Sequence, residues 1–117
     1  MADRRMIDRA IVTEGSFLEL STNAKLLYIM LNLHADDDGF VSPAAVMKLI
    51  DVGKEDLDAL IESNYIYAFD SGVVVIKDWH IHNSIRSKKG TRYATERAML
   101  DKGSNKVYIM KKKAVGA

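Results

Sequence analysis

The stretch SPAAVMKLIDVGKEDLDALIESNYIYAFDSGVVVIK, residues 42–77, decides the fold. Its opening pair, Ser42-Pro43, is typical of a helix start, because proline at the first helical position gives up no hydrogen bond. The glycine-containing turn 51–53 then separates this helix from a second one, predicted over 54–63. Two short helices joined by so tight a turn cross at a steep angle, which indicates a helix-turn-helix.

A β-hairpin follows these helices. The β-prone runs 65–69 and 73–77 flank the turn formers 70–72. Upstream, 24–33 predicts a helix that is apolar on nearly all sides, as expected of a central helix covered by several neighbours. The pair 40–41 adds a short extended piece. In this order the elements predict an α+β fold, a winged helix-turn-helix with a three-helix core and a β-hairpin wing.

The composition predicts one compact cytosolic domain. The chain has 117 residues, 48% apolar and 28% charged, enough to bury a single core. It has no cysteine, which excludes disulfides, thiol nucleophiles and cysteine-based zinc sites. The longest apolar run, 26–31, is too short for a membrane span. The polar N-terminal segment does not resemble a secretion signal, so we expect a cytoplasmic protein with no membrane contact.

Charge divides the chain into two parts. Residues 1–85 carry 7 basic and 14 acidic side chains, whereas residues 86–117 carry 10 basic and 2 acidic ones. We therefore predict a winged-helix domain over 1–85 and a basic extension over 86–117, with a short helix near 95–100 and a strand or arm at 106–110. A local basic segment attracts phosphates even when the total charge is close to zero.

Three segments in this order resemble a known family. They are Ala35 to Val41, Ser71 to Lys77, and Trp79 to Arg86, and together they resemble the N-terminal domain of phage and prophage replisome organisers, which are similar in layout to DnaD-type primosomal proteins. The resemblance implies a winged helix that binds origin DNA in replication initiation, self-associates, and contacts a helicase or helicase loader.

The residues themselves place all but one of the DNA-binding cations outside the predicted recognition helix. That helix, 54–63, has one basic residue and an exposed face predicted to carry Glu55, Asp58 and Glu62, which would repel phosphates. The predicted nucleic-acid contacts are Arg86, Lys88, Lys89 and Arg92, together with Arg4, Arg5 and Lys54. The alternative function is a protein–protein interaction or oligomerisation module with little DNA binding of its own; a solvated tail would explain the basic run equally well.

Neither a metal site nor a catalytic site is predicted. The run Asp36 to Gly39 fits a calcium loop poorly, because His34 and Ala45 would fall at positions that need carboxylates. We expect an aspartate of this run to bond its own backbone instead. His80 and His82 would share one face of an extended segment without a third ligand, so we expect them to be hydrogen-bonded. Trp79 should cap the core. With no catalytic constellation, we expect no enzyme activity and no cofactor.

Overall fold

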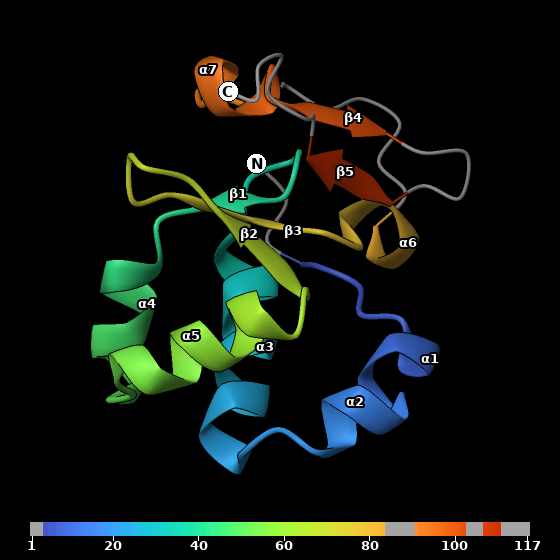
Figure 1. The fold of residues 1–117 in the computed structure, drawn as a ribbon, viewed down its shortest axis with the longest axis vertical. Coiled ribbons are helices and arrows are strands. Elements are labelled where there is room, and N and C mark those ends of the chain that lie inside the picture. The colour runs from blue at the N-terminus through green and yellow to red at the C-terminus, as the bar shows by residue number, and fades with distance from the viewer. Residues whose placement is uncertain (1–3, 84–90, 103–106, 111–117) are drawn as a thin grey trace.

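The computed structural model describes residues 4–83, 91–102 and 107–110 and shows helices around a small antiparallel sheet, the predicted α+β class (Figure 1). The elements are, in order, α1 (Arg9–Val12), α2 (Gly15–Leu18), α3 (Thr22–His34), β1 (Phe40–Val41), α4 (Pro43–Ile50), α5 (Lys54–Glu62), β2 (Ile66–Ala68), β3 (Val74–Ile76), α6 (Trp79–His82), α7 (Ala94–Arg97), β4 (Leu100–Lys102) and β5 (Tyr108–Met110).

The helix starts follow local chemistry. The Ser21 hydroxyl accepts a hydrogen bond from the backbone N–H of Ala24 at 3.0 Å, which caps α3. Helix α4 begins at Pro43, as predicted, and is closed by Asp51, which has a left-handed backbone with φ of 57°. Helix α5 starts at Lys54 after the predicted turn. The predicted limits of α4 and α5 are therefore confirmed to within one residue.

The main sheet has the strand order β1-β3-β2, with both pairs antiparallel. Val75 of the central strand lies opposite Phe40 on one side and Tyr67 on the other. At the tip of the β2–β3 hairpin, Gly72 has a φ of +91°, a conformation that glycine adopts readily. The predicted hairpin and the short strand before α4 are both confirmed.

The core lies where α3 and α5 pack against each other and α5 meets the sheet. Leu27, Tyr28 and Leu31 of α3 are fully buried. On the same helix, however, the side chains of Leu26, Ile29 and Leu33 are 41%, 39% and 47% exposed. The predicted cover by several neighbours is confirmed, because α4 and α5 both pack against this helix, but one of its apolar faces is left open. We call these three leucine and isoleucine side chains the α3 stripe.

The second sheet, β4–β5, packs near β1 and α6 (Figure 1). The Tyr108 ring is buried, and its hydroxyl donates to the carbonyl oxygen of Asp38 at 2.8 Å. The backbone N–H of Tyr108 donates to the carbonyl of Lys77 at 3.0 Å. Helix α7 is shorter than predicted, and 100–102 forms a strand instead of the end of that helix. The boundary at residue 85 stays a prediction.

Within the described ranges, no helix has both the length and the hydropathy needed to cross a bilayer.

Candidate nucleic-acid interface

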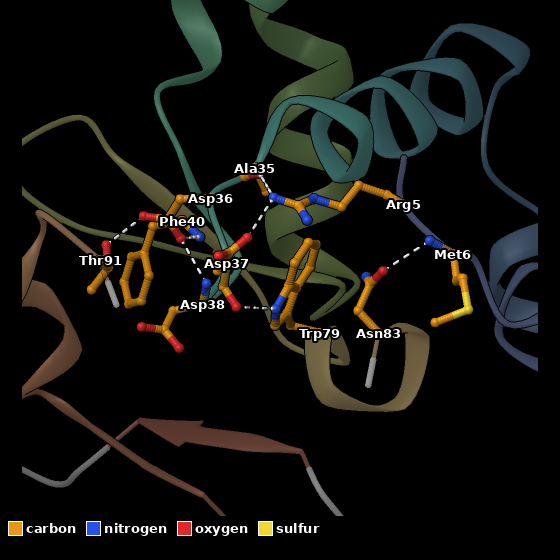
Figure 2. A network of polar contacts seen from close by, with 10 residues as sticks. All are labelled: Arg5, Met6, Ala35, Asp36, Asp37, Asp38, Phe40, Trp79, Asn83 and Thr91. Carbon is orange, nitrogen blue, oxygen red and sulfur yellow. Dashed lines mark hydrogen bonds and ion pairs between the residues drawn. The ribbon is translucent and has the colours of Figure 1, made fainter. Parts of the chain in front are cut away.

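An acidic turn, residues 36–38, takes part in a network of polar contacts (Figure 2). The Asp36 carboxylate accepts hydrogen bonds from the backbone N–H groups of Asp38 at 2.9 Å and Phe40 at 3.1 Å, which confirms the predicted self-bonded turn. The next residue, Gly39, has a φ of +91°, and a Cβ there would lie 2.6 Å from Cγ of Trp79. Only glycine therefore lets the turn lie against the indole.

Residues 4–8, which we call the N-terminal strap, contact both this turn and the end of α6. The Arg5 guanidinium donates to the Ala35 carbonyl at 2.9 Å and to the Asp37 carboxylate at 3.0 Å, and it lies 5.3 Å from the centre of the Trp79 ring. The backbone N–H of Met6 donates to the side-chain oxygen of Asn83 at 2.8 Å. Figure 2 shows these contacts running in one network from the strap to the turn.

His82 holds the end of the strap. Its Nδ1 accepts the backbone N–H of Asp8 at 2.7 Å, and its Nε2 lies 2.6 Å from the Tyr28 hydroxyl. Burial lowers the pKa of His82 to about 4, so the imidazole is neutral near pH 7 with its proton on Nε2. Burial also raises the pKa of the Tyr28 hydroxyl, which keeps it protonated.

The histidine pair differs from the expected arrangement in one respect. The hydrogen-bonded role predicted for His82 is confirmed, but the expected extended backbone is wrong, because 79–82 forms helix α6. Trp79 is fully buried and its Nε1–H donates to the Asp37 carbonyl at 3.0 Å, as predicted for a residue that caps the core. Among the residues that the structure describes, no group of three histidine, cysteine or acidic side chains could hold a metal ion.

The predicted cations lie in different environments. Arg4, Lys54 and Arg92 are exposed. The Arg5 side chain is only 3% exposed and is paired with Asp37, so its assignment as a phosphate contact is wrong: the guanidinium is already used inside the fold. The remaining predicted contacts, Arg86, Lys88 and Lys89, lie outside the described residues.

The acidic turn contacts the two described segments that carry Arg5 and Arg92. The Thr91 hydroxyl donates to the Asp36 carboxylate, which places Arg92 beside the turn. Arg5 binds Asp37 on the other side, and through Met6 the strap reaches Asn83. Asn83 and Thr91 thus both make contacts that are drawn in Figure 2, Asn83 with the strap and Thr91 with the acidic turn.

Helix α5 presents acidic side chains outward. Glu55 and Glu62 are exposed and Leu60 is fully buried, in agreement with the predicted faces, whereas Asp58, predicted to be exposed, is half-buried. Asp56 was not expected to be buried; its carboxylate accepts a hydrogen bond from the Ser21 hydroxyl at 3.2 Å.

Sequence reasoning missed a cleft beside the first turn of α4. It has a volume of about 510 Å³. We call it the α4 cleft, and its lining residues are His34, Asp36, Phe40, Val41, Ser42, Ala45, Val46, Arg92 and Tyr93. These residues come from separate parts of the chain, so no local motif could have revealed them. Arg92 donates to the Tyr93 hydroxyl at 3.0 Å and lies 5.1 Å from the centre of that ring.

Comparison of this chain with protein-family models, with curated protein sequences and with solved structures gives no match.

Proposed function

We propose that the chain is a winged helix-turn-helix domain that binds DNA in replication initiation, as in phage-type replisome organisers. Support for the fold assignment comes from the element order α3-β1-α4-α5-β2-β3 and the strand order β1-β3-β2. In this arrangement α4 and α5 form the helix-turn-helix, and the β2–β3 hairpin is the wing. A helicase or helicase loader is the protein partner that the resemblance implies.

The observation that carries the DNA-binding proposal is that the strap and Thr91, which precedes Arg92, both bond to the acidic turn. Arg4 lies in the strap, Arg92 follows Thr91, and the chain between Asn83 and Thr91 contains three further cations. The side chain of Asp37 is 11% exposed and paired with Arg5. Because the carboxylates of the turn face inward or are bonded, they oppose a nearby phosphate less than an exposed acidic face would.

Helix α5 has no role as a base reader in this proposal. Its outward Glu55 and Glu62 would face the phosphates that line a major groove, and the like charges would repel. Lys54, at the start of the helix, is the only basic residue on it. We therefore place the affinity for DNA in Arg4, Arg92 and the cations of 86–89.

The salt dependence of binding tests this proposal. Arg86, Lys88, Lys89 and Arg92 are expected to neutralise one duplex phosphate each. Together they should then contribute about −3.6 to the slope of the logarithm of the association constant against the logarithm of the salt concentration. Fluorescence anisotropy with duplex, single-stranded and forked DNA measures that slope. Changing Lys88 and Lys89 together to alanine should reduce it by about 1.8.

A matched pair of cations provides the control. Lys25 lies in the first turn of α3 and Lys48 in the last turn of α4, at the helix ends opposite to the acidic turn, and changing both to alanine removes the same charge. We expect this control to leave the slope nearly unchanged. Equal effects of the two double variants, or no measurable DNA binding at low salt, would contradict the proposal.

The α3 stripe favours a second candidate function, a self-association or protein-interaction module. Leu26, Ile29 and Leu33 are spaced so that they share one helix face, and all three are substantially exposed. Exposed apolar patches of this kind mark interaction surfaces. Sedimentation of the wild type and of Ile29→Glu at high micromolar concentration tests it: an oligomer that the variant converts to monomer supports this function, and a monomeric wild type rejects it.

A further inference from the structure

We propose that the α4 cleft binds one unpaired nucleobase of a single-stranded DNA, with an adjacent phosphate held by Arg92. The inference rests on the proposed DNA-binding function and deepens it, because it names the form of DNA that the domain prefers. It also assigns binding roles to residues of α4 and β1 that no basic segment indicates.

The interior of the cleft suits a flat apolar ring. Phe40 and Val46 are buried, and Val41 is 6% exposed, so the floor is apolar. The ring of Tyr93 lies 6.2 Å from that of Phe40, tilted by 34°. A volume of about 510 Å³ lies within the range of small-molecule sites, roughly 300–1,000 Å³, and accommodates a base with its sugar.

The rim of the cleft supplies polar groups for the edge of a base. Ser42 is exposed and its side chain makes no capping hydrogen bond to α4, and His34 is exposed. The Asp36 carboxylate lies here too, already bonded to two backbone N–H groups and to Thr91. A hydroxyl, an imidazole and a carboxylate offer both donors and acceptors to a base edge.

Charge favours a nucleic-acid strand over other flat ligands. Arg92 is exposed at the rim and carries its guanidinium over Tyr93, an arrangement in which a planar cation can stack with a base and also contact a phosphate. Asp36 offsets part of this charge locally. A base in a duplex is paired and stacked, so only an unpaired base can enter without the cost of flipping.

A cleft-filling substitution tests the inference without removing a core contact. Ala45 is exposed and lines the cleft, whereas its neighbour Ala44 is exposed and does not. We would change each to leucine, which is also a good helix former. Anisotropy titrations would use labelled oligothymidylate, a duplex of equal phosphate number, and thymidine monophosphate as a competitor.

We expect the wild type to bind the single strand more tightly than the duplex. Ala45→Leu should weaken single-strand binding about tenfold, in line with the loss of one stacked base, and should change duplex binding less than twofold. Ala44→Leu should change neither. Arg92→Gln should weaken the single strand several-fold and reduce its salt slope by about 0.7.

Three outcomes would overturn the inference. The first is that the wild type binds duplex DNA and Ala45→Leu leaves the affinity for the single strand unchanged. This outcome leaves the proposed function intact. The second is an equal loss for duplex and single strand. The third is that the cleft binds the mononucleotide as tightly as the strand, which identifies a free nucleotide as its ligand. If the wild type binds no DNA of either form, the proposed function itself fails.

Discussion

Replacing Arg5 by alanine should destabilise the whole domain, although its neighbour Arg4 should be replaceable with little effect. Arg5 makes two charge-assisted hydrogen bonds inside the fold, at 2.9 Å to Ala35 and 3.0 Å to Asp37, and lies over Trp79. The substitution leaves the Asp37 carboxylate, 11% exposed, without this partner. Arg4 is exposed, and surface substitutions of this kind change stability by less than about 0.5 kcal/mol.

The expected loss for Arg5→Ala is about 2–3 kcal/mol. Breaking a fully buried ion pair costs about 3–5 kcal/mol, and the figure is smaller here because water can reach Asp37 once the strap detaches. For a domain of this size, such a loss lowers Tm by roughly 10 °C. Arg5→Lys should lie in between, because lysine keeps the charge but cannot make the planar two-bond contact.

Thermal and urea unfolding followed by circular dichroism would measure these differences. DNA titrations on the same variants separate the two roles: Arg4→Ala should reduce the salt slope by about 0.9, and Arg5→Ala, measured where it is folded, should not. An Arg5→Ala variant as stable as Arg4→Ala would refute the structural role that we assign to the strap.

Three further predictions concern other parts of the fold. The pKa of His82 is about 4 in the folded protein, against 6.5 for a free histidine, so between these pH values only the unfolded chain binds the proton. The free energy of unfolding should therefore fall by about 3 kcal/mol as the pH drops through that window. Urea unfolding at a series of pH values should show that His82→Gln removes this fall. Gly39→Ala should lower the free energy of unfolding by about 3 kcal/mol or more, because its Cβ would meet Trp79. Gly72 has the same φ of +91° but open space around it, so Gly72→Ala should lower it by only about 1 kcal/mol. Thermal unfolding measures both. Changing Glu55, Asp58 and Glu62 to their amides should leave the preference for DNA sequence unchanged and raise non-specific affinity in competition titrations; a lost sequence preference would instead show that α5 reads bases.

Elements with strong local signals could be predicted from the sequence. Proline after serine begins α4 because its backbone is already suited to a first helical turn. The turn at Gly72 joins β2 to β3 because the residues around it are β-prone and glycine accepts a positive φ. These signals lie within a few residues of the structure that they specify.

Features that depend on distant partners could not be predicted in this way. Arg5 looks like any exposed N-terminal cation until Asp37 and Trp79 are brought to it. The apolar pattern of α3 shows how much surface could be buried, but not whether the fold supplies a neighbour for Leu26 and Leu33. The α4 cleft likewise arises only when Tyr93 comes to lie beside Phe40.

The docking of the strap also has a consequence for the order of events during synthesis. The partner of the Met6 backbone N–H, Asn83, is added to the chain 77 positions later. At roughly 5–20 residues per second, the ribosome needs about 4–15 s to add that partner. During this time α3, α4, α5 and the hairpin are synthesised while Met6 still lacks its partner. We expect the strap contacts to form after the folding transition state, so loosening the strap should accelerate unfolding and leave the folding rate almost untouched.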